Sequence, residues 1–244
     1  MAATNKRQRW RLVLATTVVL ASAQMFAAPV PPTKSPLQSS TKAAGIGTPA
    51  QVVRANFLNH AASRQVRKVA DQIVAFADHN HRPFLIVDKV HTRLFVFGAD
   101  GTLHASAPIL IGAARGDDSV PGIGLRKIAD IRPFERTTPA GRFLAEAGRN
   151  TKGEDIVWVD YDAAVSMHRV RATNPAERRL QRLATPTAAD NRISYGCINV
   201  PVAFFDEHVG PIFHSGKSYV YVLPEVRSAA DVFRWTAGTP IASN

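Results

Sequence analysis

The sequence predicts a mostly β domain with few helices, and three observations point to this class. Of the 244 residues, 45% are hydrophobic and 20% are charged, which is typical of a globular protein and excludes collagen-like, coiled-coil and wholly disordered chains. Beyond position 83 the hydrophobic residues recur with the period of two that is typical of strands. The single cysteine cannot form an intramolecular disulfide, so the fold depends on a hydrophobic core.

Residues 1–28 predict a secretory signal peptide. Four basic residues and no acid precede or flank an apolar run that begins at Leu12, and small residues at 21–23 and 27–28 offer cleavage sites. A transmembrane anchor is the alternative, but a span needs about 20 mostly apolar residues and the run is shorter and contains polar residues. We therefore expect export to the periplasm or cell wall, with membrane contact only through an uncleaved signal sequence.

Removal of the signal lowers the net charge from +11 to +7, which suits an anionic neighbourhood. Residues 29–48 are rich in proline, serine, threonine and glycine and predict a flexible linker. In residues 49–82, apolar side chains recur at spacings of three and four, which predicts a helical segment with Thr48 as its cap and Pro49 in its first turn. His79 and His81 are two residues apart and would not share a helix face, so no metal pair is expected there.

The main domain is predicted to span residues 83–224, followed by a C-terminal tail at 225–244. Glycine, proline and mixed charges at 112–137 predict an excursion on the surface. Helices are expected at 175–183 and from about 200 to 209. Strands are expected at 84–87, 94–97, 103–111, 142–144, 156–159, 164–167 and 218–223.

Cys197 has chemically organised surroundings. Gly196 leaves room beside the thiol, and Asn199 followed by Pro201 is a plausible start of a helix. A thiol just before a helix N-terminus would be favoured as thiolate, with backbone N–H groups close to a developing oxyanion. His168, at the end of a predicted strand, is the nearest candidate base in the sequence. From these residues alone, a buried inert thiol is as good an interpretation as a reactive one.

Ser194-Tyr195-Gly196-Cys197-Ile198-Asn199, with His168 upstream, resembles the signature of the L,D-transpeptidase catalytic domain (YkuD type). The signature of that family is a histidine, a spacer, and then Ser/Thr-His-Gly-Cys-hydrophobic-Asn. Residues 86–97 are similar to the opening hairpin of the family, and Thr138-Pro139-Ala140-Gly141-Arg142-Phe143 is similar to its Thr-Pro-x-Gly-x-Phe turn. The resemblance covers about residues 83–224.

The resemblance implies a β-sandwich-like catalytic domain and a cysteine-dependent acyltransferase. Cys197 would be the nucleophile and His168 the general base and acid, with the Gly196 N–H binding the oxyanion. Ser194 and the carbonyl of Arg169 would orient the imidazole. Substrate contacts are expected from Tyr195, Asn199 and Arg192. The substrates would be peptidoglycan tetrapeptide stems, joined as 3→3 cross-links, and carbapenems would be inhibitors. No metal, organic cofactor or nucleic acid is expected.

The sequence departs from the family pattern in two ways. Tyr195 stands where the family usually has a second histidine, and 25 residues separate His168 from Ser194, against a spacer usually in the mid-teens. The arginines of this longer segment either hold carboxylates of a peptide or belong to a solvated loop. A hydrolase with the same thioester and a catalytically impaired wall-binding protein are alternative functions. A nucleic-acid or lipid binder that relies on the +7 charge is disfavoured, because the basic residues lack interleaved aromatic residues.

Overall fold

The structure is a computed structural model, and it describes residues 53–235. The predicted signal peptide, the predicted linker and the Thr48-Pro49 pair lie outside the described residues. The described residues belong to one compact unit, which contains the main domain.

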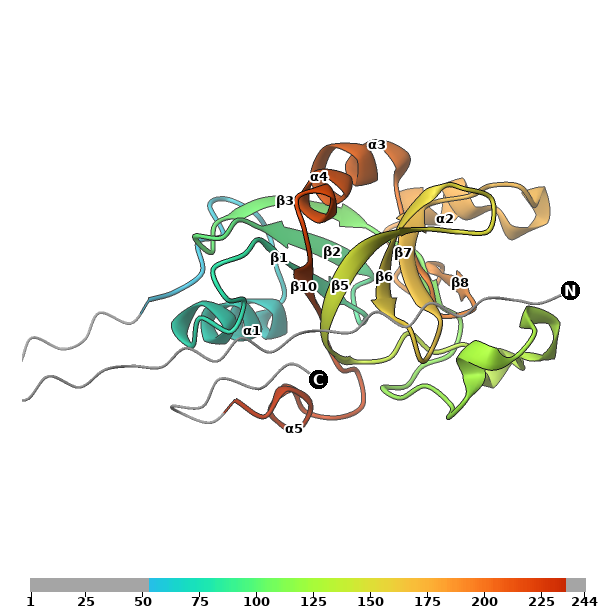
Figure 1. Cartoon of the computed structure of the whole chain (residues 1–244), viewed down its shortest axis with the longest axis horizontal. Coiled ribbons are helices and arrows are strands. Elements are labelled where there is room, and N and C mark those ends of the chain that lie inside the picture. Colours follow the sequence, from blue (N-terminus) through green and yellow to red (C-terminus); the bar gives the residue numbers. More distant parts are fainter. Residues whose placement is uncertain (1–52, 236–244) are drawn as a thin grey trace, which may run out of the picture. The chain divides into compact units, whose positions relative to one another are not determined.

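One eight-stranded sheet dominates the described part of the chain, with the strand order β3-β2-β1-β10-β5-β6-β7-β9 (Figure 1). A two-stranded sheet pairs β4 with β8. The strands are β1 Phe84–Asp88, β2 Arg93–Phe97, β3 Leu103–Pro108, β4 Ile111–Gly112, β5 Gly141–Arg149, β6 Asp155–Asp160, β7 Val165–Arg169, β8 Arg192–Ser194, β9 Ile198–Val200 and β10 Ser218–Val222.

The mostly β class is confirmed, since every predicted strand corresponds to a strand of the structure. Most neighbours in the large sheet are antiparallel, whereas β1 with β10 and β7 with β9 are parallel. The three strands that we did not predict, β4, β8 and β9, have only two or three residues each. Runs this short are hard to recognise from side-chain alternation.

One hydrophobic core joins the two halves of the large sheet. Leu85 and Val96 from one half share this core with Val157 and Met167 from the other. A helical stretch closes it, made of α3 Val202–Phe204, the π-helical turn Phe205–Val209 and α4 Gly210–His214, with Phe205, Val209 and Phe213 inward. The strands of both halves belong to one continuous sheet, and the sandwich-like arrangement that the resemblance implies stays a prediction.

A second core lies on the other face of β1, β2 and β10. Helix α1, Arg64–Ala75, packs there through Val66, Val69 and Ile73, and α5, Ala229–Phe233, adds Phe233 (Figure 1). The helical segment before the domain and the start of the predicted tail therefore belong to the folded unit. The predicted start of the first helix was wrong, because the described residues 53–62 are not helical and Ser63 is the N-cap, accepting from the Val66 N–H at 3.2 Å.

The helix predicted from about residue 200 begins two residues later and ends later, at His214. Strand β9 takes up residues 198–200 instead, and Pro201 precedes the first helical turn. Pairing of β9 with β7 satisfies backbone groups that a helix would have satisfied internally, so the sheet edge outweighs the local capping signal. Between residues 53 and 235, no helix has both the length and the apolar character needed to cross a bilayer.

Candidate active site

The parallel pairing of β7 with β9 brings the candidate histidine and cysteine to one face of the sheet. Met167 pairs with Ile198 and His168 with Asn199, so the next position back sets Ser166 opposite Cys197. Side chains alternate along a strand, so Ser166 and His168 share a face, and Cys197 points to the same face. His168 and Cys197 are therefore diagonal neighbours across two adjacent strands.

The thiol of Cys197 is half-buried and has polar neighbours on β7 and the turn before it. The Ser166 hydroxyl lies 3.6 Å from Sγ, and the Ala164 carbonyl oxygen lies 3.8 Å from Sγ. Burial by itself raises the pKa of the Cys197 thiol, but hydrogen bonding from the His168 side chain and from Ser166 outweighs it and lowers the pKa below its ordinary value. These contacts therefore make the thiolate, which is the nucleophilic form, easier to form than in an isolated cysteine.

The His168 ring is fixed in a useful tautomer. Its Nδ1 lies 2.8 Å from the Arg169 carbonyl oxygen. A carbonyl oxygen only accepts, so Nδ1 carries a proton and Nε2 of the neutral ring is left to accept the thiol proton. Once it has that proton, Nε2 can donate to the thiolate, which is the bond that lowers the pKa of Cys197. The carbonyl of Arg169 thus has the orienting position that we expected for it.

The loop before Cys197 is held by the Ser194 hydroxyl. It donates to the Cys197 carbonyl oxygen at 2.6 Å and accepts from the Gly196 N–H at 3.1 Å. Ser194 therefore orients the loop that carries the thiol, and not the imidazole as expected. The Gly196 N–H is used in this bond, so the prediction that it serves as oxyanion donor does not fit the structure. No hydrogen bond joins the Cys197 N–H to another described residue, which leaves that group for an oxyanion.

The backbone at Gly196 requires glycine. Its φ is +128°, and a Cβ at this position would lie 2.9 Å from the Thr137 carbonyl oxygen. Non-glycine residues rarely adopt such a backbone, and the neighbouring oxygen belongs to backbone that cannot move aside easily. Gly196 thus allows the backbone conformation of the loop before Cys197.

The predicted helix dipole behind the thiol is absent, because residues 198–200 form β9. The lowered pKa of Cys197 comes instead from His168 and Ser166. Ser166 was missed in the sequence, although it lies two positions before His168 in a predicted strand. The period of two would have placed it on the face of the base.

No protein-family model matches the chain, and no curated protein matches it. Among solved structures, the LD transpeptidase LdtMt1 in complex with imipenem is similar at 16% identity and a TM-score of 0.33, and the alignment covers 58% of each chain. The catalytic domain of the E. faecium L,D-transpeptidase is similar at 17% identity and a TM-score of 0.32, over 59% of this chain and 98% of that domain. At these values the likeness does not establish the family or the activity of this chain.

Asn199 is not available to a substrate. It is fully buried, its amide nitrogen donates to the Cys197 carbonyl oxygen at 3.2 Å, and its Oδ1 accepts from Arg179 at 2.6 Å. Its predicted substrate contact is therefore wrong. Asn199 instead ties the thiol loop to the segment after β7.

Arg192 is also committed to the protein. Its guanidinium donates to the carbonyl oxygens of Lys89 and Ala114 and pairs with Glu225, and its side chain is almost fully buried. Its predicted substrate contact is wrong as well, because each bond goes to a group inside the fold.

The partners of Arg192 belong to a buried ion cluster, which consists of Lys89, Asp117, Arg192 and Glu225. The Lys89 ammonium lies 2.9 Å from Asp117 Oδ1 and 3.9 Å from Glu225 Oε1. Burial lowers the pKa of Lys89 despite these carboxylates. Burial of Asp117 alone would raise its pKa, but hydrogen bonds from the backbone N–H groups of Arg227 and Glu225 and from Lys89 lower it to about 2.

Thr138 connects the ion cluster to the thiol loop. Its carbonyl oxygen accepts from the Lys89 ammonium at 3.0 Å, and its hydroxyl donates to the Gly196 carbonyl oxygen at 2.7 Å. The same hydroxyl accepts from the Gly112 N–H at 2.9 Å. In the sequence, Thr138 is only part of the turn that resembles the family. No local pattern indicates its contact with Gly196, which lies 58 residues away.

Tyr195 lies partly exposed, two residues before the thiol. The guanidinium of Arg136 stacks over its ring, with 3.9 Å between Cζ and the ring centroid. This cation–π contact fixes both side chains at the surface. Of the three predicted substrate-contact residues, Tyr195 is the one that the structure leaves accessible.

The segment between β7 and β8 carries the η4 turn Pro175–Glu177 and helix α2 Arg179–Ala184. Most of its arginines are held by protein groups. Arg171 pairs with Glu154 and Arg179 with Glu177, while Arg182 donates to two backbone carbonyl oxygens. Arg169, the last residue of β7, pairs with Asp206. These contacts favour a structural role for this segment over the capture of substrate carboxylates.

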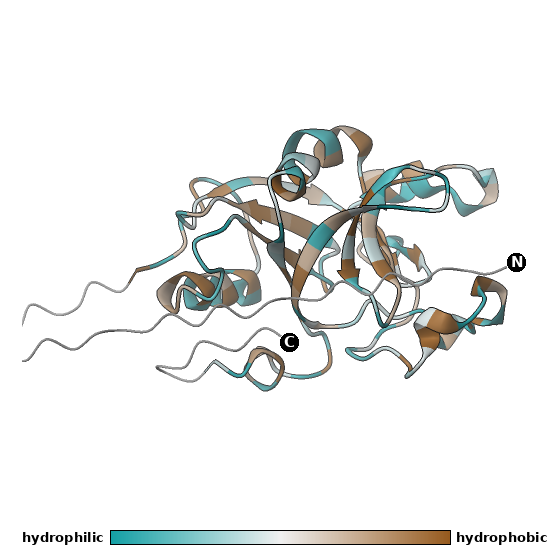
Figure 2. Cartoon of the chain, in the orientation of Figure 1, coloured by the Kyte–Doolittle hydropathy of each residue, from teal (hydrophilic) through white to brown (hydrophobic). Residues whose placement is uncertain are grey.

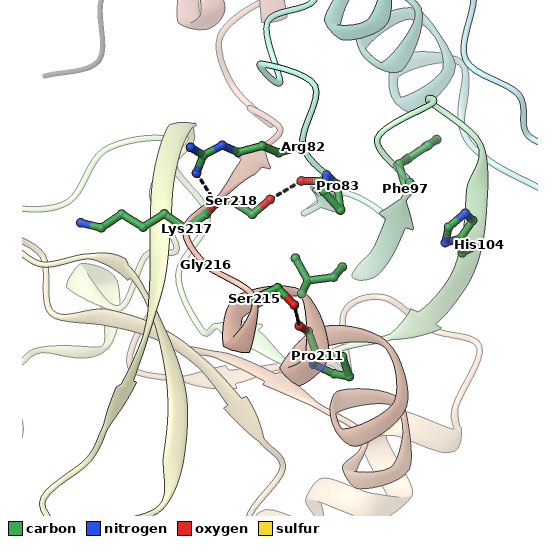
Figure 3. A pocket seen from close by; sticks show the side chains of 11 residues that line it. Arg82, Pro83, Phe97, His104, Pro211, Ser215, Gly216, Lys217 and Ser218 are labelled. Carbon is green, nitrogen blue, oxygen red and sulfur yellow. Dashed lines mark hydrogen bonds between the residues drawn. The ribbon is translucent and has the colours of Figure 1, made fainter.

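One cavity has neither Cys197 nor His168 in its lining. It has a volume of about 580 Å³ and lies between the ends of β2 and β3 and the start of β10 (Figure 3). Its walls include Phe97 at the end of β2, Pro211 in α4 and Arg82 just before β1. A smaller cavity of about 220 Å³ is lined by His168, Asp155 and Val202 among others, and adjoins the candidate base. No group of acids, histidines and cysteine within residues 53–235 could hold a metal ion.

Proposed function

We propose that the chain is an exported cysteine acyltransferase of the L,D-transpeptidase type that joins peptidoglycan tetrapeptide stems by 3→3 cross-links. One observation carries the proposal: β7 and β9 pair in a register that sets His168 and Ser166 against the thiol of Cys197, with a lowered thiol pKa. A nucleophile, a base and a group that orients the base are the parts that covalent acyl transfer needs.

In the first half of the proposed reaction, Nε2 of His168 takes the thiol proton, and the thiolate attacks the carbonyl carbon of the diamino acid residue in the donor stem. The Cys197 N–H donates to the oxyanion of the tetrahedral intermediate. When the intermediate collapses, the C–N bond to the terminal D-alanine breaks. The imidazolium protonates the leaving amine, and the stem remains bound as a thioester.

In the second half, the side-chain amine of another stem attacks the thioester carbonyl. His168 takes a proton from the attacking nitrogen and returns it to the sulfur as the C–S bond breaks. An amide between two diamino acid residues is formed, and the thiol is regenerated. No oxidant, reductant or metal takes part in this balance.

The proposal is tested with imipenem as an acylating probe, followed by intact-protein mass spectrometry of the full chain. We expect one adduct on the wild type and none on Cys197→Ala. The absence of an adduct on the wild type, or an equal adduct on Cys197→Ala, would contradict a reactive Cys197.

A second experiment separates transfer from hydrolysis. The protein is incubated with a tetrapeptide stem as donor, with and without an excess of a second stem as amine acceptor. A cross-linked dimer is expected when the acceptor is present. Release of D-alanine with only the tripeptide as product would identify a hydrolase. No turnover, together with equal binding of sacculi by wild type and Cys197→Ala, would identify a wall-binding protein.

The role of His168 is tested by the pH dependence of thiol alkylation with iodoacetamide. In His168→Gln we expect the apparent pKa of the thiol to rise, because the hydrogen bond and charge that lower it are removed. His104→Gln is the matched control, since His104 is exposed on β3 in the other half of the sheet. An unchanged profile in His168→Gln would remove the histidine from the mechanism.

A further inference from the structure

The segment before β5 exposes an unusual amount of apolar surface. Residues 120–136, called the apolar lobe here, fold into three short turns, η1 Ile123–Leu125, η2 Ile128–Asp130 and η3 Pro133–Glu135. Each turn presents one large apolar side chain to water: Leu125 is 95% exposed, Ile128 64% and Phe134 70%. Figure 2 shows hydrophobic residues along the lobe, which is the light green segment of Figure 1.

Hydrogen bonds inside the lobe hold these side chains in place. Arg126 donates through two nitrogens to the two carboxylate oxygens of Glu135, at 2.9 and 2.8 Å, and also to the Asp130 carbonyl oxygen at 2.7 Å. Glu135 accepts in addition from the Arg132 N–H at 2.8 Å. Ile123 is buried and anchors the first turn. The backbone that carries the exposed apolar side chains is therefore held in place by hydrogen bonds within the lobe.

The charges of the lobe favour an anionic partner. Its four cations outnumber its two acids, and Arg126 occupies the carboxylate of Glu135. Lys127 and Arg132 are exposed, and no ion pair to another described residue holds either of them. The guanidinium of Arg132 lies over the ring of Phe134, with 6.0 Å between Cζ and the centroid. Apolar side chains thus stand directly beside cations that are free to bind phosphate.

We propose that the apolar lobe docks the folded protein on an anionic lipid surface, independently of the apolar segment at the N-terminus. Leu125, Ile128 and Phe134 would enter the boundary between headgroups and acyl chains, while Lys127 and Arg132 bind lipid phosphates. Protruding side chains on three separate turns suit a deformable bilayer, because its boundary can take up side chains without a matching shape. Large exposed apolar groups rimmed by charges are typical of interaction surfaces.

The lobe adjoins the candidate active site. A Cβ on Gly124 would lie 2.4 Å from the Asp162 carbonyl oxygen, so the first turn packs closely on the turn before β7. The carbonyl oxygen of Ala164, in the same turn, lies 3.8 Å from the Cys197 sulfur. Docking would hold the thiol near the bilayer surface. If the proposed function is correct, this favours stems that lie close to the membrane; the docking does not depend on that function.

The test locates membrane insertion at the lobe. Leu125→Cys is made in the full chain on a Cys197→Ser background and labelled with an environment-sensitive fluorophore. Vesicles that contain phosphatidylglycerol are expected to shift the emission of this probe to the blue. The matched control carries the probe at Val226→Cys, which is 74% exposed outside the lobe, and no shift is expected there. No shift at position 125, or equal shifts at both positions, would overturn the proposal.

Variants of the cations then test the choice of lipid. The double variant Lys127→Gln, Arg132→Gln is expected to bind phosphatidylglycerol vesicles about 30-fold more weakly. Each cation near an anionic membrane surface raises the binding affinity about fivefold. Vesicles of phosphatidylcholine alone should bind more weakly than anionic vesicles. Equal affinity of the variant and the parent would contradict the assignment. Since the background lacks the thiol, the outcome is independent of the acyl transfer experiments.

Discussion

Lys89 and Leu125 lie on two segments that flank the same thiol loop, yet their environments are opposite to what their chemistry would suggest. The charged side chain of Lys89 is 1% exposed, with carboxylate and carbonyl oxygens around its ammonium, whereas the apolar side chain of Leu125 is 95% exposed. The ion cluster is linked through Thr138 to Gly196, and the apolar lobe adjoins Cys197 through the turn before β7.

The difference shows that one segment positions the thiol loop, while another segment presents side chains that can bind a partner. A buried charge is tolerated only when nearly all its hydrogen-bonding capacity is used, and the resulting network has one geometry. An exposed apolar side chain has no such restriction and remains free to bind another surface. The ion cluster is therefore expected to determine stability and the position of the loop, and the lobe is expected to contribute little to either.

We expect the greatest loss of unfolding free energy when the ion cluster is disrupted. Lys89→Met removes the buried cation beside the carboxylate of Asp117, and we expect the free energy of unfolding to fall by about 3–5 kcal/mol. Urea unfolding followed by circular dichroism measures it. Lys217→Met is the matched control, because its 53% exposed side chain pairs with Glu146 at the surface, and its loss is expected to stay under about 1 kcal/mol. Equal losses would show that the cluster has no special role.

Low pH is expected to lower the unfolding free energy by protonating Asp117 in the ion cluster. The pKa of folded Asp117 is lowered to about 2, so its contribution to stability is complete above the pKa of the unfolded carboxyl, about 4, and is lost as the pH falls toward 2. Unfolding free energies measured from pH 6 to pH 2.5 should fall in this range. In Asp117→Asn the fall should be smaller, since one lowered carboxyl is removed. The same slope in both proteins would contradict the contribution of Asp117.

Thr138→Val removes the link between the ion cluster and the thiol loop. The Gly196 carbonyl and the Gly112 N–H each lose a buried partner, and we expect a loss of about 1–3 kcal/mol in unfolding free energy. The pH profile of Cys197 alkylation should change as well, because the loop that carries the thiol shifts. Thr138→Ser keeps the hydroxyl and should restore that profile. A normal alkylation profile in Thr138→Val would limit Thr138 to stability.

The smallest effect is expected in the apolar lobe. Leu125→Ser removes an apolar side chain that is exposed to water, so the unfolding free energy should change by less than about 0.5 kcal/mol. Ile123→Ser, two residues earlier and buried, is the contrasting variant and should lower the free energy by several times more. A large loss in Leu125→Ser would mean that the side chain packs within the protein and is not held for a partner.

The mostly β class and the longer strands could be predicted from the sequence. The alternation along 84–87 and 94–97 is a local pattern. It predicted the two strands that the structure has as β1 and β2. The roles expected for Asn199 and Arg192 failed because a motif does not show which neighbours occupy a side chain. Arg179, which holds Asn199, and Glu225, which holds Arg192, lie 20 and 33 residues away in the chain.

Local patterns of the chain were sufficient for the longer strands and for the choice of Cys197 and His168 as candidates, since periodicity and short motifs act over a few residues. The register of β7 on β9, the use of the Gly196 N–H by Ser194 and the burial of Lys89 arise from pairings that form when distant segments meet. Those pairings depend on how hydrogen bonds and packing are satisfied throughout the fold. Whether the sulfur is primed as a nucleophile therefore rests on contacts that no stretch of sequence contains.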